Sequence, residues 1–250
     1  MVLPADLEQH VIRLRHLLQH VVDHKPVDVF ELVINKIRIS NKLFKQNNTY
    51  HKLWGFTIDR DQPLCFKMAD IKGVCPFIEV TGIMKWNGCE NLPVEYNMEL
   101  LIWSRELAYR GEWDALRIKK ATDIGDDGDI NNKGRVILRI HFDRRVSDAC
   151  EPEFHLHIGG DAPDNELCWF PKQLELPRIP YPPLDLVLIA ELILANFFEL
   201  DYQEISRKPE WRALVHSSQK AMLMEFINKC KSIIDKDKSL TDWLWGLTNE

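Results

Sequence analysis

The chain opens with an amphipathic pattern. Apolar residues recur at spacings of four and three, which predicts one face of a helix over residues 5–24. These residues are Leu7, Val11, Leu14, Leu18 and Val21. Residues 27–45 carry a weaker helical stripe in which β-branched side chains dominate, so the pattern there leaves helix and strand both open.

From about residue 56 to residue 159 the pattern changes to alternation, which is typical of antiparallel strands with one solvated face. It is clearest over 94–103, where the apolar residues are Tyr96, Met98, Leu100 and Ile102. The expected strands are 56–60, 64–69, 77–86, 94–103, 113–119, 135–142 and 153–158. No helical pattern interrupts them, which favours a meander over a doubly wound parallel sheet.

The last third of the chain is helical again. Residues 184–198 are apolar on nearly every side, which predicts a buried helix; they are too few to span a bilayer and include Asp185 and Glu191. Ser206 is expected to cap a longer helix over about 207–234, followed by a short helix at 240–247. The expected core face of the longer helix is formed by Trp211, Leu214, Val215, Met222, Phe226, Cys230 and Ile233.

These elements predict one α+β domain over residues 1–250. It has an N-terminal helical segment at 1–46, an antiparallel meander of about six or seven strands at about 56–159, and C-terminal helices at 181–250. We expect the N-terminal helix and two or three C-terminal helices to cover one sheet face, leaving the other face solvated.

Composition narrows the class of protein. A hydrophobic content of 45% over 250 residues is that of a folded globular chain. The net charge of −6 argues against nucleic-acid binding, which requires a basic surface. Six scattered cysteines without a CxxC motif, and the absence of a signal-like N-terminus, predict a cytoplasmic protein without a membrane anchor. No glycine-rich nucleotide motif occurs, and we expect no cofactor.

Histidines form the first candidate site. His155 and His157 lie two apart on an expected strand, so both imidazoles leave the same face, and His141 on the neighbouring strand joins them. Three histidines could bind zinc, or one could act as an acid or base. The favoured interpretation is a solvated polar face without a metal, in which charged side chains pair across strands. Its charged members are Arg135, Arg139, Glu95, Glu99 and Glu153.

Cys168 is the second candidate. It lies eleven residues beyond His157, ahead of the C-terminal helices. The order strand, strand, histidine, loop, cysteine, helix over about 134–230 resembles in outline the ubiquitin-conjugating (E2-like) fold. The resemblance implies a thioester on Cys168 with His155 or His157 nearby. The family's His-Pro-Asn tripeptide is not present, because Ile-Gly follows His157.

Two functional hypotheses follow. The first is a cytoplasmic protein-binding or accessory subunit of a larger protein assembly, without a complete catalytic site of its own. Its partner-binding residues are expected to be Arg135, Arg139, His141, Trp103, Trp243 and Trp245. The alternative is a small enzyme, for E2-like thioester transfer or hydrolysis, in which Cys168 acts with His155 or His157.

Overall fold

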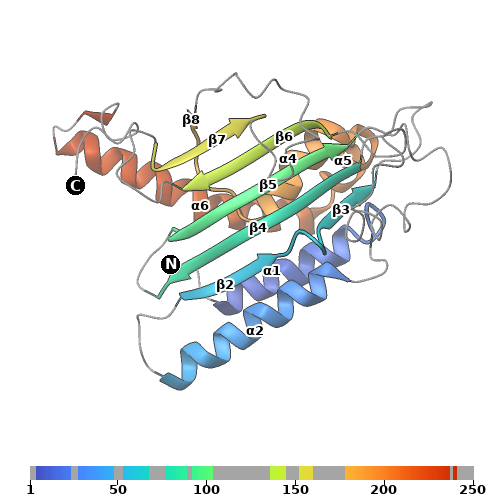
Figure 1. Cartoon of the computed structure of the whole chain (residues 1–250), viewed down its shortest axis with the longest axis horizontal. Helices are drawn as coiled ribbons and strands as arrows, with labels where there is room; N and C mark the ends of the chain where they lie inside the picture. Colours follow the sequence, from blue (N-terminus) through green and yellow to red (C-terminus); the bar gives the residue numbers. More distant parts are fainter. Residues whose placement is uncertain are drawn as a thin grey trace, which may run out of the picture.

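The chain is organised around an antiparallel sheet. The computed structural model describes residues 4–23, 28–47, 53–67, 77–88, 92–103, 136–144, 152–159, 178–236 and 239–240. Within them, the helices lie on one face of the sheet (Figure 1). The predicted α+β class and the antiparallel strand order are therefore confirmed.

The described strands form a sheet in which all pairs are antiparallel. In spatial order the strands are β1 (Val22–Asp23), β3 (Leu64–Lys67), β4 (Phe77–Asn87), β5 (Glu95–Trp103), β6 (Val136–Arg144), β7 (Phe154–Ile158) and β8 (Ile179–Pro180). The remaining strand, β2 (Leu53–Ile58), continues the line of β3 along the same side of β4. The expected strand at 113–119 lies outside the described residues.

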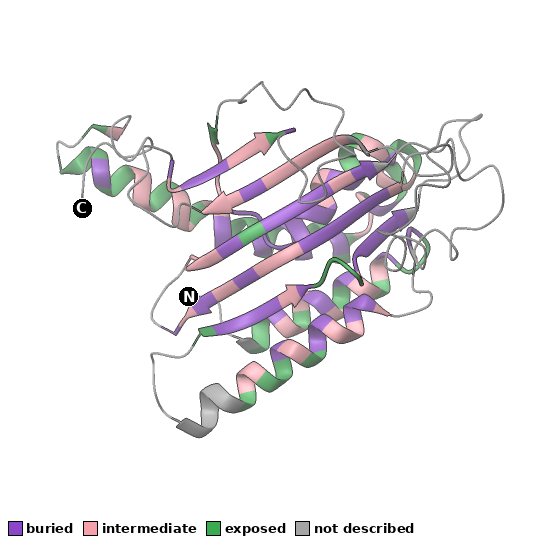
Figure 2. Ribbon diagram, in the orientation of Figure 1, coloured by how far each residue is buried: buried purple, intermediate pink, exposed green. Residues whose placement is uncertain are grey.

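Alternation along the strands decides which side chains face the helices. Tyr96, Met98, Leu100 and Ile102 of β5 are all buried, as predicted. Figure 2 shows how much of β4 and β5 is buried at the centre of the sheet. The Tyr96 hydroxyl donates to the carbonyl of Leu184 and accepts from its N–H, which attaches β5 to the segment before the next helix.

Two helices precede the sheet, α1 (Pro4–Leu17) and α2 (Val29–Asn47). The apolar stripe predicted from Leu7 to Val21 is buried, but α1 ends at Leu17 rather than at residue 24. The N–H groups of Val21 and Val22 both bond to the Leu18 carbonyl in a turn, and the chain then enters β1. The ambiguous segment 27–45 is helical because its apolar positions fall on one helix face that packs on α1 and β2.

Three described helices follow the sheet: α4 (Leu186–Phe197), α5 (Glu199–Ile205) and α6 (Pro209–Asp235). As predicted, α4 is largely buried. Its N-cap, Asp185, accepts from the backbone N–H of Leu188 at 2.9 Å and from the hydroxyl of Ser218 on α6. Burial raises the pKa of this carboxyl. No described helix combines the length and apolarity that a membrane crossing needs.

The prediction that Ser206 caps α6 is wrong. Ser206 lies in the turn after α5, where its N–H bonds to the carbonyl of Tyr202. Helix α6 begins at Pro209, and Lys208 at the N-cap position makes no side-chain cap. Proline suits the first turn, where an N–H would have no intrahelical partner. The expected helix at 240–247 lies almost wholly outside the described residues.

Gly82 occupies a backbone conformation that side chains rarely adopt, where β4 meets β2 and β5. Its φ is +141°, and a Cβ built there would lie 2.1 Å from the carbonyl oxygen of Asn97. Both the conformation and the close approach of two strands therefore require glycine at this position.

We expect Gly82→Ala to lower the free energy of unfolding by about 3 kcal/mol, because it adds backbone strain and a steric clash. Urea unfolding of the purified protein measures this change. Asn97→Ala alters an exposed side chain on the adjacent strand and is the control, with an expected change below about 0.5 kcal/mol. Equal stability of the two variants would contradict the strained geometry.

Candidate functional site

The predicted histidines meet on the outer face of the sheet, which is the face turned away from the helices. The strand register places Glu99 of β5, His141 of β6 and His157 of β7 side by side. His155 lies two residues before His157 and shares its face. The prediction that these imidazoles lie on one face of neighbouring antiparallel strands is therefore confirmed.

The three rings pack on one another. The centroids of His141 and His157 are 5.4 Å apart, and those of His155 and His157 are 4.8 Å apart. The Nδ1 atom of His155 lies 2.8 Å from the carbonyl oxygen of Pro152. A carbonyl only accepts, so Nδ1 carries the proton and donates it.

The expectation of a solvated outer face is wrong at two positions, His155 and Glu99. His155 is only 2% exposed and Glu99 only 3% exposed. Alternation along a strand determines the face on which a side chain lies, but it does not determine whether other parts of the chain cover that face. His157 keeps a larger exposed fraction and is only half-buried.

Burial changes the proton affinity of the imidazoles. It lowers the pKa of His141 to about 3, with the positive charge of Arg139 as the next cause. Burial, followed by the neighbouring His155, lowers the pKa of His157 to about 4. Both rings are therefore neutral at pH 7, and each is a weak base with little acid form to donate.

Arg139 joins the strands beside this cluster. Its Nε donates to the buried carboxylate of Glu99, and its Nη1 donates to the carbonyl oxygen of Gly159 at 3.3 Å. The same carboxylate accepts from the hydroxyl of Thr81 at 3.5 Å and lies 3.5 Å from Nη2 of Arg60. This predicted partner-binding residue is thus largely engaged in linking β5 to the end of β7.

Contrary to the prediction from the sequence, Glu153 does not pair across strands on the outer face. It precedes β7, and its carboxylate contacts Nη2 of Arg144 at 2.9 Å and Nζ of Lys229 at 2.8 Å. Because Lys229 belongs to α6, the carboxylate connects the sheet to the helical layer. Glu95, by contrast, pairs across strands with Lys85 at 2.8 Å, as expected of the outer face.

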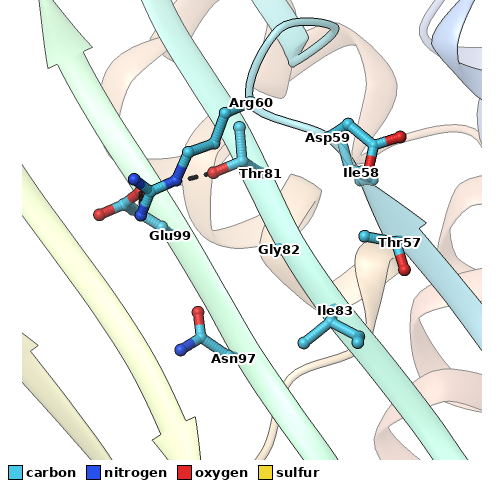
Figure 3. A pocket seen from close by; sticks show the side chains of 9 residues that line it. All are labelled: Thr57, Ile58, Asp59, Arg60, Thr81, Gly82, Ile83, Asn97 and Glu99. Carbon is cyan, nitrogen blue, oxygen red and sulfur yellow. Dashed lines mark hydrogen bonds and ion pairs between the residues drawn. The ribbon is translucent and has the colours of Figure 1, made fainter. Parts of the chain in front are cut away.

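A shallow pocket of about 220 Å³ opens on the outer face near the end of β2. Figure 3 shows Arg60 and Glu99 with their side chains close together over the central strands. The charges around it are paired: Asp59 binds Nζ of Lys36 at 2.8 Å, and Arg60 faces Glu99. The lining residues are Thr57, Ile58, Asp59, Arg60, Thr81, Gly82, Ile83, Asn97 and Glu99.

The described residues assemble neither a metal centre nor a nucleophile beside the histidines. Among them, no three His, Cys, Asp or Glu side chains are grouped to hold a metal ion. The described thiols lie on other elements, Cys65 on β3 and Cys230 on α6. Cys168 lies outside the described residues, so its pairing with His155 or His157 stays a prediction.

The remaining predicted partner-binding residues are only partly placed. Trp103 ends β5, where its backbone pairs with Phe77 and Val136, and its side chain is not described. Arg135, Trp243 and Trp245 lie outside the described residues. Their role in binding a partner stays a prediction.

An exposed apolar surface on α6 is not among the features that the sequence pattern predicts. Met224, Ile227 and Ile234 are 47%, 52% and 54% exposed, and the exposed residues of this helix are visible in Figure 2. The spacing of its apolar residues predicts only the core face of this helix. The available signal was the presence of large apolar residues outside that core face.

Comparison with known proteins adds no assignment, since no protein-family model, curated protein or solved structure matches this chain. The chemistry and exposure of the residues described above are therefore the basis for a functional assignment.

Arg139→Ala should lower the free energy of unfolding by about 3 kcal/mol, because it leaves the buried Glu99 carboxylate without its main partner. Lys85→Ala, which breaks the more exposed pair with Glu95, is the matched control and should cost less than about 1 kcal/mol. Urea unfolding of both variants makes the comparison. Similar losses would indicate that the Glu99–Arg139 pair is no more than a surface ion pair.

Acidification should destabilise the fold through the two shifted histidines. Their folded-state pKa values of about 3 and about 4 lie below the value of 6.5 expected when unfolded, so between these values the unfolded chain binds more protons. Their contribution to stability is complete above pH 6.5 and falls as the pH decreases toward 4. Melting temperatures measured across this range should decline less steeply for His141→Gln/His157→Gln, whereas an unchanged slope would contradict the burial of these rings.

Proposed function

We propose that this chain is a cytoplasmic protein-binding subunit of a larger protein assembly, without a complete catalytic site of its own. The outer face of the sheet supports the part of this proposal that gives the chain no complete catalytic site. Its buried carboxylate is paired with arginine, and the imidazoles of His141 and His157 are neutral at pH 7. Groups held in this way stabilise the sheet and offer little reactivity.

The exposed apolar row on α6 is the observation that carries the proposal. Met224, Ile227 and Ile234 are each about half exposed on one helix. Single exposed apolar residues are common on protein surfaces, whereas a row of them marks an interaction site. Large aliphatic side chains presented on a rigid helix are suited to bury area against another protein.

The position of α6 makes this row accessible. The helix is anchored by Lys229, which pairs with Glu153, and by Phe226, which packs edge-on against Phe154 with centroids 6.2 Å apart. Beyond these contacts its C-terminal part continues past the ends of β6 and β7 (Figure 1). A partner can therefore approach the exposed side of α6 without displacing the sheet.

Affinity purification from native lysate should recover a partner whose amount falls at least about tenfold when Ile227→Asp is introduced, because an interface centre tolerates a charge poorly. Quantitative mass spectrometry measures the recovered proteins. Leu200→Asp on α5 is the control, since Leu200 is 79% exposed on another helix and should leave recovery unchanged. Circular dichroism checks that both variants stay folded. A chain that remains a monomer without partners, or equal recovery with both variants, would contradict the proposal.

A further inference from the structure

Ile227 and Ile234 of the exposed apolar row on α6 belong to a longer pattern. Leu223, Ile227, Cys230 and Ile234 follow one another at spacings of four, three and four, the spacing of a seam between two packed helices. We call these four residues the α6 seam. Ile227 and Ile234 are exposed, and Leu223 is partly exposed. The sequence predicts Cys230 on the core face of the helix, but the structure leaves it partly exposed. The seam extends over about 16 Å of helix, or three turns.

A neighbouring side of α6 packs on the protein, and Leu223 at the start of the seam packs partly against the same core. Trp211, Met222 and Ile233 on that side are each at most 6% exposed. The hydroxyl of Ser218 donates to the buried carboxylate of Asp185. The seam is therefore held in place before any partner arrives, which lowers the entropic cost of docking a second helix.

The charged side chains beside the seam indicate the charge of the partner that would bind there. Lys220 and Lys231 are exposed and lie along one flank, and neither makes an ion pair with a residue that the structure describes. Lys229, on the packed side, is by contrast paired with Glu153. Asp235 is the one exposed carboxylate on this flank among the described residues of the helix. A partner that places carboxylates opposite the two lysines gains attraction that a basic partner would lose.

A second copy of this chain fits the seam less well. It would bring the same two lysines to the interface, with Asp235 near its end as the exposed acidic counterpart. A lipid surface is also disfavoured, since each lysine contributes only about 1 kcal/mol to binding an anionic membrane. The pattern best matches a partner helix with its own apolar heptad positions and flanking Asp or Glu.

We propose that the α6 seam binds an acidic amphipathic helix of a partner protein, with Lys220 and Lys231 selecting its charge. This inference rests on the proposed protein-binding function and names the kind of segment that is bound. Cys230 lies within the seam, so its thiol reports directly on occupancy.

The test uses the full chain and two labelled synthetic helices with the same apolar heptad positions. One carries Glu and the other carries Lys at the flanking positions. In fluorescence anisotropy the acidic helix should bind at least about tenfold more tightly, and added salt should reduce the difference. Binding of the acidic helix should also slow the modification of Cys230 by iodoacetamide, which mass spectrometry measures.

Charge reversal provides the decisive variant. Lys220→Glu/Lys231→Glu changes two exposed side chains, so it should fold normally and shift the preference to the basic helix. Arg207→Glu/Arg212→Glu, which makes the same change in charge at exposed positions near the start of α6, is the matched control and should keep the preference for the acidic helix. Equal binding of both helices, an unchanged preference after reversal, or unprotected Cys230 would overturn the inference.

Other occupants give distinct results. Self-association in sedimentation analysis that is lost with Ile227→Asp, or binding to phosphatidylserine vesicles instead of the helix, would also overturn it. If a lysate partner depends on Ile227 but neither synthetic helix binds, only the acidic-helix inference fails. If no lysate partner depends on Ile227, the proposed function fails as well.

Discussion

One-sided burial of the antiparallel sheet is the constraint on which the rest of the structure depends. Helix α4 is apolar around most of its circumference, so it is stable only when enclosed, and it packs against α1, α5 and α6 beneath the sheet. The Asp185 carboxylate is buried in the same layer, where it caps α4 and accepts from Ser218. Because side chains alternate along a strand, the neighbours of each residue that faces this layer lie on the outer face.

The residues on the outer face are therefore determined by which residues of the same strands face the core. It receives Glu99, Arg139 and the histidines, and parts of it are buried as deeply as the core. Charges placed there need partners within the protein, which explains the Glu99–Arg139 pair and the neutral imidazoles.

Helix α6 connects the core to the surface that we assign to binding. Its packed side carries Trp211, whose indole N–H donates to Glu191 at 2.7 Å, while the hydroxyl of Tyr202 donates to the other oxygen of the same carboxylate at 2.7 Å. One carboxylate thus ties α4, α5 and α6 together. Because these contacts orient the helix, its other side is displayed in a defined position.

Periodicity in the sequence by itself determined the α+β class, the buried α4 segment, and the face on which each residue of 94–103 lies, since these follow from spacings of two and of three to four along the chain. It also placed His141, His155 and His157 on one face. Only the tertiary structure decided that His155 and Glu99 are buried, that Glu153 turns to Lys229, that 27–45 is helical, and that one side of α6 stays exposed. Spacing specifies direction relative to the local backbone, whereas burial and pairing depend on segments that are distant in sequence and meet only in the folded chain.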